Sequence, residues 1–342
     1  MQTVTFGIVG CGRIAQRHAE HISNFGALHA VCDIKLERAE QLANKYGCRA
    51  YSNLKIMLQQ EPECQVISVC TPNAFHAEHT ILSLRAGKHV ICEKPMALST
   101  IDCKKMIEEA KKNKRKLFVV KQNRFNPPVV ALKRAIEEGR LGNILNIQLN
   151  CFWNRNEQYY RDSEWKGRLA LDGGTLFTQF SHFIDLIYWL NGDIKKVYPI
   201  LKNMNHQKII DFEDTGVIAL EFENGALGTI HYTVNSYKKN MEGSITVFGT
   251  KGTVKVGGQY LNVLEYQSIA DYEIPEIKEV RPANDYGFYQ GSMSNHDKVY
   301  ANVLDVLLNN GKIATNGEEA MKTVEIIEKI YRYRQVKACH EE

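Results

Sequence analysis

Short apolar runs alternate with amphipathic segments from the start of the chain to about residue 123. Such runs are typical of buried strands, and the segments between them show the period of helices that cover a sheet. Strands are predicted at Val4–Val9, Leu28–Asp33, Ala50–Tyr51, Val66–Cys70, Lys88–Cys92 and Leu117–Val120, and helices at Ile14–Phe25, Lys35–Tyr46, Leu54–Gln60, His76–Ala86 and Thr100–Asn113. This alternation predicts an α/β domain, a doubly wound parallel sheet with right-handed crossovers.

The pattern changes beyond Arg124–Pro128, where a helix at Val129–Glu138 ends in Gly139. Long alternating segments follow, joined by turns of Gly and Asn, and they predict an α+β domain on an open, mostly antiparallel sheet. Its strands are predicted at Ile144–Trp153, Thr215–Glu223, Ala226–Val234, Gly243–Phe248 and Gly252–Val256, with helices at Gly174–Leu190, Asp297–Leu308 and Gly317–Arg334. We divide the chain into domains at residues 1–123 and 124–342, and expect the last two helices to pack back on the first domain.

Composition narrows the function classes. The 342 residues carry a net charge of only +4, so we expect no nucleic-acid partner. The basic run Lys111–Lys116 lies at a predicted helix end, and we interpret it as a solvated face. The nine cysteines lack Cys-x-x-Cys spacing, which argues against a disulfide framework or a zinc site and fits a reducing cytoplasm. A first strand at residue 4 leaves no room for a signal peptide, and no apolar run is long enough to cross a membrane.

The first strand runs directly into Gly10-Cys11-Gly12-Arg13-Ile14-Ala15 and then into a predicted helix. Strand, glycine turn and helix make a dinucleotide site, because glycines let the backbone approach a pyrophosphate and the helix start offers it N–H groups. Asp33 ends the second strand 23 residues beyond Gly10, where an acid accepts hydrogen bonds from the adenosine ribose and repels a 2′-phosphate. NAD is therefore favoured, although Lys35 and Arg38 keep NADP open, and Asp33 can also serve as a helix N-cap.

Glu93-Lys94-Pro95 lies at the carboxyl end of the predicted strand Lys88–Cys92. Strand ends on that edge of a doubly wound sheet face the cofactor crevice, so we expect the Lys94 amine beside the nicotinamide. A cationic neighbour and partial desolvation would lower the pKa of Lys94 toward the working pH, which suits a group that handles a proton. The alternative is a surface turn without function.

The segments Gly10–Ala15 and Cys92–Leu98 together resemble the Gfo/Idh/MocA family of sugar and cyclitol oxidoreductases, and the similarity extends over nearly the whole chain. The resemblance implies a Rossmann domain at residues 1–123, a substrate-binding and oligomerisation domain at 124–342, and NAD as cofactor. Thr71-Pro72-Asn73 matches a family turn that lies under the cofactor's ribose and diphosphate. His76 lies on the helix that begins there; it is a candidate cofactor contact, and the alternative is a histidine on the helix surface. The implied cofactor contacts are Gly10, Gly12, Arg13, Ile14, Asp33, Thr71, Asn73, His76, Glu93, Lys94 and Gln122.

The glycine-rich segment Asp172–Asp185 resembles the part of the family that carries catalytic residues on a helix. Thr178 and His182 are four residues apart and are expected to share one helical face, with Asp185 either orienting His182 or lying one turn too deep. The family commonly has an acid at the position of Thr178, which this chain lacks. The predicted catalytic residues are His182, as general base, and Lys94, which positions the hydroxyl, with the reverse assignment left open. A buried structural histidine is the alternative for His182.

Three segments, Gln122–Pro127, Gly174–Gln179 and Ser294–Tyr300, are most similar to a branch that oxidises C3 of UDP-N-acetylglucosaminuronate or UDP-N-acetylglucosamine for bacterial surface polysaccharides. Such a substrate is an anion. The cations Arg155, Arg161, Lys166 and Arg168 are candidates for its carboxylate and phosphates, or else are ordinary surface charge. The predicted substrate contacts are Lys94, Asn123, Arg124, Arg155, Tyr160, Trp165, Arg168, Thr178, Gln179 and His182.

The resemblance also bears on partners and on alternative functions. It implies a homodimer or homotetramer formed through the exposed face of the C-terminal sheet, and no metal is expected, because His182 has no second ligand at metal-binding spacing. An inositol or free-aldose dehydrogenase is the enzymatic alternative. A non-catalytic NAD(H)-binding sensor or scaffold is the alternative from a different class.

Overall fold

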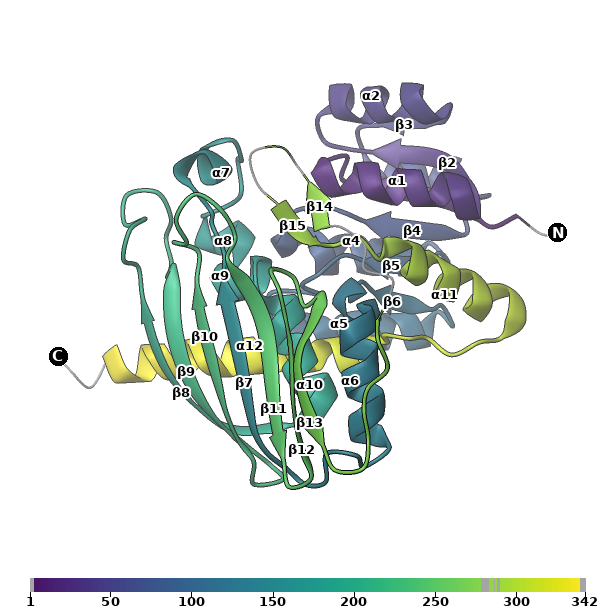
Figure 1. Ribbon diagram of the computed structural model, residues 1–342. Coiled ribbons are helices and arrows are strands. Elements are labelled where there is room, and N and C mark those ends of the chain that lie inside the picture. The colour runs from purple at the N-terminus through teal and green to yellow at the C-terminus, as the bar shows by residue number, and fades with distance from the viewer. Residues whose placement is uncertain (1–2, 278–282, 286, 288–289, 339–342) are drawn as a thin grey trace. The chain divides into compact units, whose positions relative to one another are not determined.

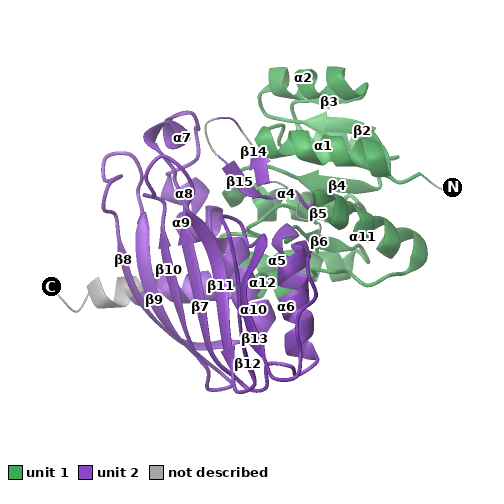
Figure 2. Ribbon diagram, viewed as in Figure 1, with its two compact units in different colours: residues 1–121, 296–324 green, residues 122–295, 325–342 purple. Residues whose placement is uncertain are grey.

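The computed structural model describes residues 3–277, 283–285, 287 and 290–338. The chain forms two units, one of residues 1–121 and 296–324 and one of residues 122–295 and 325–342 (Figure 2). The long helix α12 (Gly317–Ala338) contributes its first part to the first unit and its remainder to the second. None of the helices among these described residues combines the length and the apolarity that crossing a membrane needs.

The first unit is built on a parallel sheet of six strands in the order β3-β2-β1-β4-β5-β6 (Figure 1). Its elements are β1 (Thr5–Val9), α1 (Arg13–Phe25), β2 (Ala27–Cys32), α2 (Leu36–Tyr46), β3 (Arg49–Tyr51), α3 (Leu54–Gln60), β4 (Val66–Val69), the 3-10 turn η1 (Asn73–Phe75), α4 (His76–Arg85), β5 (His89–Cys92), α5 (Thr100–Lys112), β6 (Leu117–Val119) and α11 (His296–Asn309). The central strands are buried on both faces, as their nearly continuous apolar sequences require. The predicted doubly wound α/β fold is confirmed, and α11 packs on α1.

The second unit is built on a seven-stranded sheet in the order β13-β12-β11-β7-β10-β9-β8, antiparallel except between β7 and β10. Its elements are η2 (Gln122–Phe125), α6 (Pro127–Glu137), β7 (Ile144–Phe152), α7 (Glu157–Arg161), α8 (Leu169–Asp172), α9 (Thr175–Thr178), α10 (Ser181–Asn191), β8 (Ile194–Lys202), β9 (Thr215–Phe222), β10 (Leu227–Thr233), β11 (Glu242–Gly249), β12 (Gly252–Gly257), β13 (Val263–Ile269), β14 (Ala283–Asp285) and β15 (Gln290–Met293). The predicted mostly antiparallel sheet is confirmed. Its edge strands β8 and β13 went unpredicted, because edge strands carry charged residues and, in β8, a proline that weaken the apolar alternation.

One face of this second sheet is covered and the other is open. In β9 and β10, Ile218, Leu220, Ile230 and Tyr232 point to the covered face and are buried. Helix α10 packs against β7 on that side, and α12 lies on the same face (Figure 1). The hydroxyls of Tyr331 on α12 and of Tyr232 both donate to the buried carboxylate of Glu213, which ties the end of α12 to the sheet.

The helix predicted at Gly174–Leu190 is two helices, α9 and α10, separated by Gln179 and Phe180. Phe180 has non-helical backbone angles (φ −115°, ψ 5°), and its buried ring packs on Trp153, with 5.5 Å between ring centroids. The helix is therefore interrupted where the Phe180 side chain enters the core. Thr178 ends one helix and His182 lies in the next, so the prediction that they share one helical face is wrong.

Candidate active site

The glycine turn after β1 has the shape that a phosphate requires. Gly10 has a φ of +87°, and a Cβ there would lie 2.7 Å from the carbonyl carbon of Cys70, so only glycine fits. Gly12 is the N-cap of α1, and no atom of the described residues lies within 4 Å of the position that its Cβ would take. Arg13 and Ile14 begin the helix, which has no side-chain cap and no acidic residue in its first turn. The turn thus offers room, main-chain amides and the positive end of a helix dipole to an anion such as a pyrophosphate.

Asp33 follows β2 and is held between the glycine turn and α2. One carboxylate oxygen accepts the main-chain N–H of Cys11 at 2.8 Å, and the other accepts that of Lys35 at 2.9 Å. The N-cap position of α2 belongs to Lys35, so Asp33 is not the helix N-cap that the sequence left open. Two main-chain donors fix the carboxylate at the strand end where a ribose contact is predicted.

His76 joins two loops of the first unit. The side chain is buried, so the alternative of a histidine on the helix surface is wrong. Its Nδ1 lies 2.6 Å from the carbonyl oxygen of Pro95, and its Nε2 lies 2.8 Å from that of Thr71. Burial lowers the pKa of the imidazole. Both ring nitrogens face main-chain carbonyls, and a neutral ring has a single N–H, so His76 donates to one of the two carbonyls and contacts the other. It thereby joins the turn containing Thr71 and Asn73 to the turn containing Lys94.

Glu93 directs its carboxylate at two histidines from distant parts of the chain. Its Oε1 accepts from Nε2 of His18 at 2.8 Å and from Nε2 of His296 at 3.2 Å, while its Oε2 accepts the main-chain N–H of Lys94 at 3.1 Å. Burial alone would raise the pKa of Glu93, but the hydrogen bonds from the two histidines outweigh it and hold the pKa well below its usual range. Glu93 is therefore ionised, and the Lys94 side chain that follows it is half-buried.

The same three side chains also have the composition of a metal site. Ligand atoms of His18, Glu93 and His296 all lie within 4.8 Å of one another. Hydrogen bonds from two imidazoles to one carboxylate explain this closeness without an ion. This cluster was not predictable from the sequence, because His18 and His296 are separated from Glu93 by 75 and 203 residues.

A carboxylate lies beside Thr178 in the second unit. The Thr178 hydroxyl donates to Oδ1 of Asp172, the last residue of α8, and Oδ2 of Asp172 accepts the main-chain N–H of Gly167 at 2.8 Å. Asp172 is buried. Position 178 lacks the acid that the family commonly has, and a carboxylate from the neighbouring short helix α8 lies beside it instead. His182, near the start of α10, is 2% exposed.

Arg124 and Asp185 form a buried ion pair within the second unit. The guanidinium donates through Nε at 2.7 Å and through Nη2 at 2.9 Å to the two oxygens of Asp185, a bidentate arrangement. The same guanidinium lies 5.2 Å from the ring centre of Trp189. The Asp185 carboxylate, considered above as a partner for His182, thus anchors η2 to α10.

A second network surrounds Arg155. Its guanidinium lies 4.8 Å from the ring centre of Trp153 and 5.1 Å from that of Tyr159, and Nε donates to the Gln179 side-chain oxygen at 2.7 Å. The Gln179 amide in turn donates to the Tyr159 hydroxyl at 2.8 Å. Lys166 places its ammonium 3.7 Å from the Tyr159 ring centre. Tyr159 is thus the centre of this network.

The remaining predicted substrate contacts differ in their surroundings. Arg168 is exposed, Trp165 is half-buried, and Tyr160 is buried beside Tyr159 with 5.1 Å between ring centroids. Arg161, the fourth cation of the predicted cluster, pairs with Glu157 on its own helix. The four cations therefore differ in burial and in the groups that they contact.

Asn123 on η2 is buried at 2% exposure, and neither atom of its side-chain amide has a hydrogen-bond partner in the described part of the chain. Leaving a buried amide without a partner costs about 1–3 kcal/mol. The neighbouring Gln122 uses its amide nitrogen to donate to Ser292 Oγ at 3.0 Å, while its side-chain oxygen has no such partner. The end of β6 thus leads into a turn that presents polar groups suited to a bound polar molecule.

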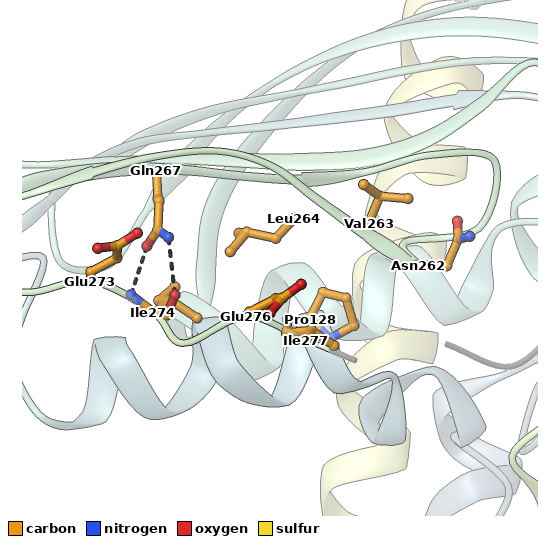
Figure 3. Close-up of a pocket in the computed structure, with 9 residues that line it drawn as sticks. All are labelled: Pro128, Asn262, Val263, Leu264, Gln267, Glu273, Ile274, Glu276 and Ile277. Atoms are coloured by element: carbon orange, nitrogen blue, oxygen red, sulfur yellow. Dashed lines mark hydrogen bonds between the residues drawn. The ribbon is translucent and has the colours of Figure 1, made fainter. Parts of the chain in front are cut away.

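A pocket of about 400 Å³ lies elsewhere in the second unit, beside β13 (Figure 3). It is lined by Pro128, Asn262, Val263, Leu264, Gln267, Glu273, Ile274, Glu276 and Ile277. None of the predicted site residues is among them. The Gln267 amide is occupied by the main chain of Ile274, to which it both donates and accepts (Figure 3). We therefore do not assign the substrate to this pocket.

Two family models match the chain. The model of the Gfo/Idh/MocA oxidoreductase family, NAD-binding Rossmann fold, matches residues 4–121, and the model of the Gfo/Idh/MocA C-terminal domain matches residues 129–255. Together they span both units, and the first covers the glycine turn, Asp33 and Lys94.

Relatives and solved structures agree with these matches. The WlbA dehydrogenase of Bordetella pertussis, in complex with NADH and UDP-GlcNAcA, is 35% identical, covers 97% of this chain and 96% of its own, and has a TM-score of 0.87. The WlbA dehydrogenase of Chromobacterium violaceum, with the same two ligands, is 33% identical over 97% of this chain and 93% of its own, with a TM-score of 0.88. Myo-inositol 2-dehydrogenase of Thermotoga maritima is 31% identical over 260 residues, 72% of this chain and 73% of that protein.

Proposed function

The chain belongs to the Gfo/Idh/MocA family of oxidoreductases, and from this membership we propose that it oxidises the C3 hydroxyl of a UDP-N-acetylhexosamine or its uronate to the 3-keto sugar. It is an NAD-dependent dehydrogenase that acts on a sugar CH–OH group. The observation that supports the finer substrate is the 35% identity, over nearly the full length of both chains, to a dehydrogenase solved with NADH and UDP-GlcNAcA.

The proposed reaction removes a hydride from C3 and a proton from its oxygen. NAD, when bound, accepts the hydride. In the proposal the Lys94 ammonium donates a hydrogen bond to the reacting oxygen and positions it, and His182 accepts the proton as general base. Gly10, Gly12 and the start of α1 hold the pyrophosphate, and Asp33 accepts from the ribose hydroxyls.

The second unit supplies the proposed contacts to the sugar nucleotide. Arg155 is fixed by two aromatic rings and by Gln179, so its planar guanidinium is preorganised for a carboxylate or phosphate. Asn123 offers a buried amide that has no protein partner among the described residues. A sugar hydroxyl or acetamido group would satisfy it and recover the free energy of a missing hydrogen bond.

Inositols are a second candidate substrate class, because the chain is similar over most of its length to myo-inositol 2-dehydrogenase of Thermotoga maritima. The experiment that separates the two is a spectrophotometric assay of NADH formation with NAD and, in parallel, UDP-N-acetylglucosaminuronate, UDP-N-acetylglucosamine, myo-inositol and free aldoses. We expect turnover with a UDP-sugar and little with the others. Turnover confined to inositol or free aldoses would contradict the proposed substrate.

We further propose that the protein is a homodimer or homotetramer of the cytoplasm, where NAD and nucleotide sugars are available, and that its product serves bacterial surface polysaccharides. Apolar side chains on the open face of the second sheet support the oligomer. They are 39% to 67% exposed: Tyr198, Ile200, Val217, Leu227, Phe248 and Tyr266. Apolar side chains gathered on an open sheet face are typical of a surface that a partner covers.

A further inference from the structure

A line of buried side chains joins β4, α1 and α11 to the loop after β5 within the first unit. The Tyr300 hydroxyl lies 3.0 Å from Ser68 Oγ and 2.7 Å from Nδ1 of His18. Nε2 of His18 and Nε2 of His296 then meet the same oxygen of Glu93, at 2.8 Å and 3.2 Å. All five residues are at most 5% exposed, so water hardly competes for these hydrogen bonds.

Hydrogen-bonding capacity fixes the direction of this line. The ionised carboxylate of Glu93 only accepts, so both histidines donate from Nε2. Burial lowers the pKa of His18, against the opposing effect of Glu93, and keeps the ring neutral. A neutral imidazole has one N–H, so Nδ1 of His18 accepts from the Tyr300 hydroxyl, and the Tyr300 oxygen accepts from Ser68.

The far end of the line is the main chain of Lys94. Oε2 of Glu93 accepts the Lys94 N–H at 3.1 Å. Beyond Lys94, Nδ1 of His76 lies 2.6 Å from the carbonyl oxygen of Pro95. Side chains from three helices, α1, α4 and α11, therefore fix the backbone on both sides of Lys94. A lysine stem is flexible, so a fixed backbone limits the volume that its ammonium can reach.

We propose that His18, His296 and Tyr300 are positioning residues that hold the Glu93 carboxylate and, through it, the backbone of Lys94 in its working orientation. The inference rests on the proposed function, because that function gives Lys94 its catalytic role. It also accounts for the spacing of His296 and Tyr300: four residues apart on α11, they lie on the same face of the helix.

The Tyr300 hydroxyl has the most specific part in this arrangement. By donating to Nδ1 of His18 it forces the proton of the neutral ring onto Nε2, where it serves Glu93. Without the hydroxyl, His18 can carry the proton on Nδ1 instead, and Glu93 loses a donor. Outer hydrogen-bond partners that fix a tautomer typically contribute about 10–100-fold to activity at metal sites, and we expect the lower end here.

A double-mutant cycle between Tyr300→Phe and Lys94→Ala tests the inference. Tyr300→Phe should lower kcat by about tenfold, while KM for the sugar and the Kd for NADH, measured by fluorescence titration, change by less than about twofold. In Lys94→Ala, which has already lost the amine, the same substitution should cause no further loss, because effects that pass through one residue are not additive. Losses that multiply would overturn the inference.

Tyr232→Phe is the matched control. Tyr232 is equally buried and donates to a buried carboxylate, Glu213, at 3.0 Å in the second unit. It should lower Tm about as much as Tyr300→Phe does and leave kcat unchanged. A fall in kcat that tracks Tm in both variants would show that Tyr300 contributes only to stability, and would also overturn the inference.

His296 provides an independent measurement, which decides the matter if Tyr300→Phe does not fold. His296→Gln keeps an N–H donor for Glu93 and His296→Ala removes it, so kcat should be nearer to wild type in the glutamine variant. Equal kcat values in the two variants contradict a positioning role. Wild-type protein that forms no NADH with any UDP-sugar would instead refute the proposed function, so the two failures are distinguishable.

Discussion

At the scale of single residues, four carboxylates at or beside predicted site residues are buried, and each accepts hydrogen bonds from identified donors. Asp33 accepts from two main-chain amides, Glu93 from two histidines, Asp172 from Thr178, and Asp185 from Arg124. A buried charge is tolerated only when it is paired or hydrogen-bonded in this way. Substitutions at these positions therefore change the local structure together with the chemistry.

Lys94→Ala should lower kcat by about a hundredfold or more, as expected for loss of a positioned proton-handling group, and leave NADH binding nearly unchanged. The measurements are steady-state kinetics with the UDP-sugar and fluorescence titration of NADH. Lys105→Ala, which removes an exposed lysine of the same unit, is the control and should behave as wild type. Turnover near the wild-type value in Lys94→Ala would remove Lys94 from the mechanism.

Asp33→Ser should shift cofactor preference toward NADP. The carboxylate that repels a 2′-phosphate is lost, and Lys35 and Arg38 follow in the sequence. We expect the ratio of kcat/KM for NAD to that for NADP to fall by about tenfold or more, the scale of one charged contact. Side-by-side kinetics with both cofactors measure it. A wild-type enzyme that already prefers NADP would show that Asp33 does not read the ribose.

Thr178→Asp should destabilise the fold, because it places a second carboxylate against Asp172. Two carboxylates that share one site repel each other, and the pKa of one of them rises. The raised pKa makes the loss of stability greatest at neutral pH and smaller as the pH falls through it. We expect a loss of about 1–3 kcal/mol at pH 7, measured by denaturant unfolding.

Two further variants check the origin of this effect. Thr178→Ser keeps the hydroxyl that donates to Asp172 and should remain within about 0.5 kcal/mol of wild type. Combining Thr178→Asp with Asp172→Asn removes the repulsion and should restore most of the stability. A single Thr178→Asp variant as stable as wild type at all pH values would contradict the contact between these residues.

At the scale of secondary-structure elements, buried histidines connect helices to the loops of the first unit. His18 links α1 to the loop after β5, and His76 links α4 to the carbonyls of Thr71 and Pro95. These hydrogen bonds, rather than apolar packing, attach the loops to the helices. They depend on pH, because a neutral imidazole has one N–H donor and a protonated imidazole has two.

The fold should consequently lose stability as the pH falls below about 6.5. Burial lowers the pKa of both His18 and His76 below the ordinary value of 6.5. Below that value the unfolded chain binds protons that the folded chain does not, so the stability is present above pH 6.5 and is lost on acidification. The slope is at most about 1.4 kcal/mol per pH unit for each histidine.

Thermal unfolding between pH 8 and pH 5 measures this loss. The His76→Gln variant, which cannot titrate, should show a shallower fall in Tm than wild type over the same range. A Tm that is constant from pH 7 to pH 5 would show that these histidines do not stay neutral in the folded protein.

At the scale of the whole molecule, the open face of the second sheet carries apolar side chains that are exposed in the described part of the chain. Ile200 on β8 and Val217 on β9 are directly paired across the two strands and are 67% and 46% exposed. On β9 and β10 the larger apolar side chains, such as Ile218 and Tyr232, face the core instead. The outward pair therefore lies where a second copy would gain most from covering it.

We expect a dimer or larger assembly by light scattering at micromolar concentration. The variant Ile200→Lys with Val217→Lys should dissociate it, because burying two charges without partners costs more than the lost apolar contacts. Far-ultraviolet circular dichroism should remain native, since both side chains point away from the core. A wild-type monomer, or an assembly unaffected by the double variant, would contradict this interface.

The sequence by itself determined the order of strands and helices in the first unit, the glycine turn, the position of Lys94 at a strand end and the membership of a family. These are local properties: period, turn chemistry and short spacing specify them without knowledge of distant contacts. The break between α9 and α10 escaped prediction, because the core position of Phe180 overrides a continuous helical pattern.

Only the tertiary structure decided which partner each functional side chain has. Glu93 meets His18 and His296 across 75 and 203 residues, and the hydroxyl that orients His18 comes from Tyr300, 282 residues away. Asp172 contacts Thr178 because the four-residue helix α8 ends at Asp172 beside it. No periodic pattern carries such information, because these contacts depend on how separate elements pack, and burial then makes the hydrogen bonds between them obligatory.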